Sequence, residues 1–181
     1  MHWAEFERAQ PRLAAVGQQR LVDPGVLLVA TIRADGTPRL SPVEPVLMDG
    51  GLWLSMLWDS AKARDLARDP RILVHGVVSS RDGRAGEFKV RGTVRAEHDR
   101  GVQGRFARLV ASTLGWDPVP GRFHLFEVEL AQAAFLRYDD ATGDQFTASW
   151  PPPREFVRRG TSPTSLGAAE AWSDLVDGAA G

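Results

Sequence analysis

The alternation of apolar and polar positions predicts a short helical segment followed by a run of strands. Residues 2–20 have helical spacing, and Pro11 indicates a second helix start. Their apolar anchors are Trp3, Phe6, Leu13 and Val16. Val26–Arg33 is a continuous apolar run rich in β-branched residues, which predicts a strand that is buried on both faces.

Asp-Gly pairs at 35–36 and 49–50 predict two tight hairpins, because Asp-Gly accepts the positive φ angles that such turns require. The first pair leads into a return strand over Pro38–Met48. Pro42 and Pro45 cannot donate hydrogen bonds to a neighbouring strand. Part of this return strand is therefore expected to be an edge, a bulge or a bend.

Leu52–Pro70 joins a third strand, over Leu52–Leu57, directly to a short helix that Asp59 or Ser60 caps and that ends before Pro70. Its predicted apolar face is Ala63, Leu66 and Ala67, and its predicted solvated face is Arg64, Asp65, Arg68 and Asp69. At such a helix start, unpaired backbone N–H groups and the positive end of the helix dipole point the same way. The segment therefore predicts an anion site, and a phosphate-bearing ligand is the first hypothesis.

The second half of the chain predicts three more strands and one longer helix. The strands are Ile72–Val78, Glu87–Glu97 and the final strand Phe123–Tyr138, and the helix begins at Asp99. In Glu87–Glu97 the residues expected to face inward are Phe88, Val90, Val94 and Ala96. Six strands joined mostly by hairpins predict a mostly β fold with flanking short helices, in the form of a closed or nearly closed antiparallel barrel.

The chain changes character after this barrel. Residues 1–150 are predicted to form the barrel domain with its N-terminal helix. Residues 151–181 begin with three prolines and continue with many Gly, Ala, Ser and Thr residues. We expect an extended segment and a tail that covers a partner chain or is partly disordered.

The composition excludes several classes of function. The 181 residues carry a net charge of −1, so the whole molecule does not attract nucleic acid or acidic membranes. The absence of cysteine excludes disulfides, thiolate metal sites and cysteine nucleophiles. No two histidines have metal-ligand spacing, and no serine-hydrolase signature is present. With no apolar run long enough to span a membrane, the sequence predicts a soluble cytoplasmic protein.

Two ordered stretches, ATIRADGTPRLSPV and LWLSMLWDSAKARDLARDP, carry a resemblance to a known family. With the hairpins between them, they resemble the FMN-binding split-barrel family, whose best-known branch is pyridoxamine 5′-phosphate oxidase. The resemblance extends over roughly residues 22–140. It implies a six-stranded antiparallel split β-barrel, a homodimer, and FMN bound in a cleft between the subunits.

The resemblance also implies roles for individual residues. Ser60 and Lys62 fall where the family holds the cofactor phosphate. Arg39 and Ser41 would reach the phosphate, the ribityl chain or the ring. The backbone of Pro42 and Val43 would lie along the ring edge, and Ser55 and Met56 would line its other side.

The chain departs from the oxidase branch at two places. Ala61 stands where that branch commonly has an arginine before the phosphate lysine, and no arginine-bearing final strand can be matched. These departures argue against pyridoxamine 5′-phosphate oxidase activity itself. Three tryptophans are further candidates: Trp53 and Trp58 for stacking on a planar ring, and Trp150 for covering a cleft.

Three hypotheses remain. The first is an FMN-dependent oxidoreductase that exchanges a hydride with a small organic substrate. The second is an F420-dependent reductase, whose longer anionic cofactor would use Arg64 and Arg68 or the basic strand at 89–95. The third is a flavin- or haem-binding module without turnover, with His75 as the candidate haem ligand. Nucleic-acid binding is not expected, because the cations of that strand have no interleaved aromatic residues.

Overall fold

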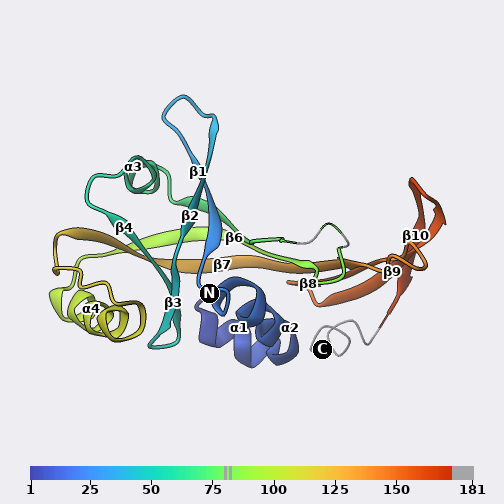
Figure 1. The fold of residues 1–181 in the computed structure, drawn as a ribbon, viewed down its shortest axis with the longest axis horizontal. Helices are drawn as coiled ribbons and strands as arrows, with labels where there is room; N and C mark the ends of the chain where they lie inside the picture. Colours follow the sequence, from blue (N-terminus) through green and yellow to red (C-terminus); the bar gives the residue numbers. More distant parts are fainter. Residues whose placement is uncertain (80, 82, 173–181) are drawn as a thin grey trace.

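The computed structural model describes residues 1–79, 81 and 83–172, and one antiparallel sheet dominates it (Figure 1). Within the barrel the strands are β1 (Leu27–Ile32), β2 (Pro38–Val43), β3 (Pro45–Met48), β4 (Gly51–Leu57), β5 (Arg71–Gly76), β6 (Glu87–Glu97) and β7 (Phe123–Tyr138). The sheet runs β7-β6-β5-β1-β2, while β3 pairs with β4 and β4 pairs with β7. Only Glu44 separates β2 from β3, so the chain continues from β2 through β3 into β4. The pairing of β4 with β7 then brings the sheet back to the strand from which this order starts. The mostly β, antiparallel barrel predicted from the sequence is therefore present.

Strand β7 also pairs with a strand outside the barrel, and this overturns one expectation. Its first part pairs with β4, while residues 133–138 pair with β8 (Gln145–Trp150). Two further strands follow, β9 (Arg154–Ser162) and β10 (Ser165–Ala171). Phe123–Tyr138 is thus not the final strand, and the described residues form a sheet of ten strands rather than six. The prolines at 151–153 lie in the turn between β8 and β9, so they connect paired strands. The expected division at residue 150 falls in this turn.

The hairpins show where the strand predictions were right and where they were wrong. Asp49 and Gly50 both have positive φ angles, of 50° and 77°, as a tight Asp-Gly hairpin requires. The return strand breaks at Glu44, which confirms the bend expected from the two prolines that flank it. Strand β1 was expected to be buried on both faces, but its residues alternate between buried and half-buried. One face of this strand packs on the core, while the other is only partly covered.

The helices cover one face of the barrel and one of its ends (Figure 1). Helices α1 (Trp3–Ala9) and α2 (Pro11–Gly17), with a π-helical turn over Gln18–Val22, bury all four predicted anchors against the sheet. Helix α4 (Arg100–Leu114) begins at Asp99, whose side chain accepts a hydrogen bond from the backbone N–H of Val102. Beneath α4 lies a second core cluster formed by Val46, Met48, Trp53, Phe106, Val110, Phe123 and Leu125. The α4 end of the barrel therefore has a core of its own.

The inward face of β6 is shorter than predicted. Phe88, Val90 and Val94 are buried, but Ala96 is exposed because it lies beyond the main core cluster, at the end of the strand. Along the described residues, no helix combines the length and the apolar character that a membrane crossing requires.

Candidate functional site

The candidate site begins at the turn between β4 and helix α3 (Ala61–Arg68). Asp59 has a positive φ of 56°, which turns the chain sharply so that Ser60 becomes the N-cap residue. The Ser60 side chain makes no capping hydrogen bond. Its hydroxyl oxygen is buried and has no hydrogen-bond partner within the described part of the chain. A buried polar atom of this kind is uncommon in folded proteins, and here it lies beside the unpaired N–H groups of a helix start.

Lys62 extends from the first turn of α3 toward the end of β2. Its Nζ donates a hydrogen bond to the carbonyl oxygen of Pro42 at 3.1 Å. One carbonyl uses only one of the three donors of an ammonium group, so Lys62 can also bind an anion. This hydrogen bond joins the first turn of α3 to the end of β2 and positions the lysine.

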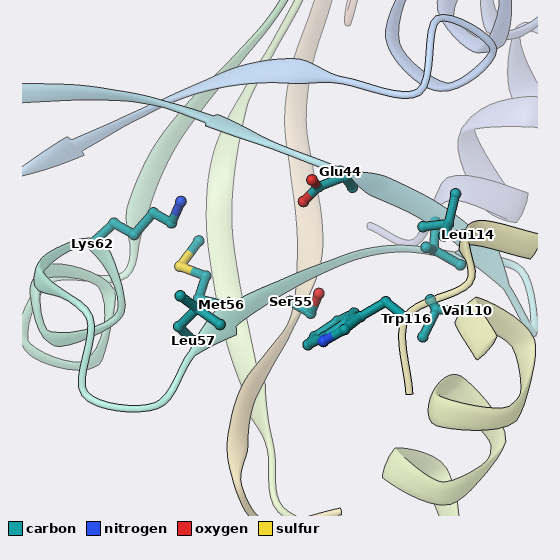
Figure 2. A pocket seen from close by; sticks show the side chains of 9 residues that line it. Glu44, Ser55, Met56, Leu57, Lys62, Val110, Leu114 and Trp116 are labelled. Carbon is teal, nitrogen blue, oxygen red and sulfur yellow. The ribbon is translucent and has the colours of Figure 1, made fainter. Parts of the chain in front are cut away.

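Lys62 forms one end of a cavity of about 560 Å³. The lining residues are Glu44, Val46, Ser55, Met56, Leu57, Lys62, Val110, Leu114 and Trp116. Figure 2 shows Glu44 and Ser55 on opposite sides of this space, with Lys62 at one end and Val110, Leu114 and Trp116 at the other. A pocket of this size, mostly apolar with a few polar groups, is typical of small-molecule and cofactor sites.

The structure brings some of the predicted residues together and separates others. Ser55, Met56 and Lys62 line the cavity, and Pro42 contributes its carbonyl to Lys62. The Val43 side chain belongs to the main core cluster, and the contact of its backbone with the ring stays a prediction. Ser41 is half-buried on β2 outside the cavity lining.

Arg39 has a partner that the sequence did not predict. Its Nε donates to the Asp65 carboxylate at 2.6 Å, and Thr31 donates to the same oxygen at 2.9 Å. Asp65 was expected on the solvated face of α3, but only 4% of it is exposed, and Ala67, expected on the apolar face, is exposed. Burial opposes the ionisation of Asp65, yet hydrogen bonds from Arg39 and Thr31 outweigh it and lower the carboxyl pKa below its usual value. Arg39 and Asp65 therefore join β2 to α3.

The side chains of the three candidate tryptophans and of His75 contact other residues of the protein. Trp150 was expected to cover a cleft, but it packs in the core against Phe6, with ring centroids 5.5 Å apart. Trp53 is buried and donates to the carbonyl oxygen of Met48. Trp58 is exposed and stacks on His124. Both ring nitrogens of His75 have partners, the Gly76 carbonyl and the Glu87 carboxylate. Across the residues that the structure describes, no group of three or more potential metal ligands comes together.

Sequence reasoning missed the far side of the cavity. Val110 lies on α4, and nothing in the sequence pattern predicts that this helix packs against β3 and β4. Trp116 lies in the segment after α4, and its indole packs edge-on against Phe123, at 6.1 Å between ring centroids. Glu44 carries a local signal, since it directly precedes Pro45 at the break between β2 and β3.

Comparisons with known proteins now place the chain. The model of the family described as "Pyridoxamine 5'-phosphate oxidase" matches residues 15–137. The chain belongs to this family. All nine residues that line the cavity lie within the range matched by the pyridoxamine 5′-phosphate oxidase family.

Solved structures support the same fold at low identity. A putative pyridoxamine 5′-phosphate oxidase from Listeria innocua has a TM-score of 0.57 at 16% identity, over 70% of this chain and 97% of its own. A protein described as an F420 reductase has a TM-score of 0.51 at 19% identity, over 64% of this chain and 94% of its own. A haem storage protein from Vibrio cholerae has a TM-score of 0.52 at 17% identity, over 67% and 89%. No curated protein matches the sequence. Solved structures similar to this chain thus include proteins described as an F420 reductase and as a haem storage protein.

Proposed function

We propose that this member of the pyridoxamine 5′-phosphate oxidase family binds FMN and acts as an oxidoreductase on a small organic substrate. The observation that carries the proposal is the continuous cavity that leads from Lys62, beside the start of α3, to Ser55 and Met56 on β4. Its volume of about 560 Å³ lies within the range of small-molecule sites. The residues present fit a phosphate-bearing group, because the buried Ser60 hydroxyl lacks a partner where the helix N–H groups are unpaired.

Each residue would have a defined task. Lys62 and the first turn of α3 would hold the phosphate by charge-assisted hydrogen bonds. The Pro42 carbonyl keeps the lysine beside β2. Met56 and Val110 line the cavity with apolar surface and exclude water, while the Ser55 hydroxyl offers a hydrogen bond. A bound flavin would supply the hydride chemistry, so that the protein needs no metal or general base for it.

A second copy of the chain is part of this proposal. Leu57 and Trp58, at the end of β4, are 68% and 60% exposed, and Leu114 at the end of α4 is also exposed. Leu57 and Leu114 line the cavity, so these apolar side chains lie around its mouth. Exposed apolar patches of this kind are typical of protein interfaces, and a twofold dimer would cover two such patches. Light scattering on the purified protein should give twice the chain mass, and a monomer would contradict the dimer.

The charges favour FMN over F420. The longer anionic tail of F420 requires additional cations, but of those considered only Arg91 has no hydrogen-bond or ion-pair partner among the described residues. Arg64 binds Asp59, Arg68 binds the carbonyl oxygen of Ile32, and Lys89 binds Glu87. Haem is disfavoured because both ring nitrogens of His75 have hydrogen-bond partners.

The test is a titration of FMN and F420, side by side, with the full-length protein. FMN binding should quench the flavin fluorescence and saturate at one cofactor per chain, with F420 binding more weakly. Tighter binding of F420 than of FMN would assign F420 as the cofactor. The absence of binding by both would overturn the proposal. An absorption spectrum and a mass measurement of any small molecule that co-purifies would identify the natural occupant directly.

A further inference from the structure

The two ends of the cavity differ in their chemistry. At one end Lys62 and the start of α3 present positive charge. At the other end α4 and the segment after it contribute Val110, Leu114 and Trp116, which carry no charge (Figure 2). If a phosphate binds at the Lys62 end, the uncharged end is left for another part of the cofactor or for a second molecule.

Glu44 places a negative charge between these ends. It lies at the break between β2 and β3, and its carboxylate extends into the space opposite Ser55 (Figure 2). Among the residues that the structure describes, Glu44 has no hydrogen-bond or ion-pair partner. Glu44 is exposed, so its carboxylate is hydrated, and it repels anions that enter the cavity and attracts cations or N–H donors.

Trp116 adds a flat surface. Its indole is held by the edge-on contact with Phe123, while 37% of the residue remains exposed. A tryptophan that is anchored on one side and open on the other is suited to stack on a planar ring, and it also binds cations over its face.

We propose that Glu44 and Trp116 form the substrate subsite, and that it takes a flat aromatic molecule with a cationic or N–H-donating group. The same carboxylate would reject anionic substrates, including phosphorylated ones, at this end of the cavity. That this molecule is a substrate rests on the proposed function. The preference for a cation over an anion follows from Glu44 and Trp116 alone.

Three probes of nearly equal size and shape test this preference: benzamidine, which is a cation, benzamide, which is neutral, and benzoate, which is an anion. Their dissociation constants would be measured by calorimetry on the full-length protein. We expect benzamidine to bind about tenfold or more tighter than benzoate, with benzamide between them. Equal binding of benzamidine and benzoate, or no binding of any probe, would overturn the proposal.

Variants assign the effect to residues. Glu44→Gln should bring the benzamidine-to-benzoate ratio close to one, whereas Trp116→Ala should weaken benzamidine and benzamide by a similar factor and keep their ratio. The matched control is Glu7→Gln, which neutralises an exposed carboxylate on α1, outside the cavity lining, and should leave the ratio unchanged. If Glu44→Gln retains the wild-type ratio while its unfolding midpoint is also unchanged, Glu44 is not the selecting group.

The subsite and the proposed function can fail separately. FMN titration of the same samples reports on the Lys62 end. If the protein selects among the probes by charge but does not bind FMN, the flavin proposal is wrong and the subsite proposal stands. If it binds FMN but does not select by charge, the flavin proposal stands and the subsite proposal is wrong.

Discussion

Helix α3 carries two charged residues three positions apart that have opposite surroundings. Asp65 is buried and saturated, with Thr31 and Arg39 as hydrogen-bond partners and Arg68 at 3.7 Å. Lys62 has one hydrogen bond, to a backbone carbonyl, and otherwise faces the cavity. The difference separates two uses of charge on one short helix. A charge whose hydrogen-bonding capacity is filled by the protein holds the fold together, and a charge with spare capacity beside a cavity can hold a ligand.

The largest effect is expected at Asp65. Replacing it with alanine leaves the half-buried Arg39 and the buried Thr31 without their acceptor, so Asp65→Ala should lower the free energy of unfolding by about 2–3 kcal/mol. Urea denaturation measures the change. The control is Arg64→Ala, because the pair of Asp59 with Arg64 is exposed and should contribute less than about 1 kcal/mol. Equal losses in the two variants would remove the distinction between these charges.

Lys62→Ala should have the opposite effect, which is little loss of stability and a large loss of FMN affinity. Its loss should leave the unfolding free energy within about 0.5 kcal/mol of wild type, because its one bond is exposed. FMN affinity should fall about ten- to a hundredfold, as expected for the loss of a charge-assisted phosphate contact. Fluorescence titration measures the affinity. A variant that binds FMN as wild type does would place the phosphate elsewhere.

Low pH should remove the stability that the Asp65 carboxylate contributes. Because the pKa of Asp65 is lowered in the folded state, its contribution to stability is complete above the unfolded pKa near 3.9 and is lost as the pH falls through the folded pKa. The urea midpoints of wild type and Asp65→Ala should therefore converge below about pH 4. A difference that stays constant down to about pH 2 would mean that the Asp65 carboxylate is not the stabilising group.

The smallest effect, and the sharpest contrast, is expected at Ser60. An N-cap serine replaced with alanine ordinarily costs about 1 kcal/mol of stability. Ser60 makes no capping bond and its hydroxyl is buried without a partner in the described chain, so Ser60→Ala should be neutral or slightly stabilising. FMN affinity should nevertheless fall about two- to tenfold. A destabilised variant with unchanged FMN binding would make Ser60 an ordinary cap.

The sequence was sufficient wherever the signal was local. The Asp-Gly hairpins, the Asp99 cap and the exact bounds of β6 and β7 follow from turn residues and periodicity within a few positions. The same local signals located the helix start at Asp59 or Ser60, and the structure has Ser60 as the N-cap residue.

The failures share a physical cause, which is contact between distant segments. Asp65 was assigned to solvent because its neighbours on α3 are charged. Its burial depends on Thr31 and Arg39, which are 34 and 26 residues away. Trp116 reaches the cavity only because α4 packs on β3 and β4. The strands after residue 138 were missed because a run of prolines suggests the end of a domain, whereas it forms a turn between paired strands.

The length of β7 has a consequence for self-association. Residues 133–136 pair with β6 on one side, and residues 133–138 pair with β8 on the other. A chain shortened after Tyr138 would leave the β8 side of this segment with unpaired N–H and C=O groups, and such an edge recruits strands from other molecules. The last three strands move that edge outward to β10, whose pairing with β9 is interrupted by register shifts and whose residues are mostly small. Irregular edges of this kind are poor templates for aggregation, so the extension β8–β10 protects the barrel that carries the site.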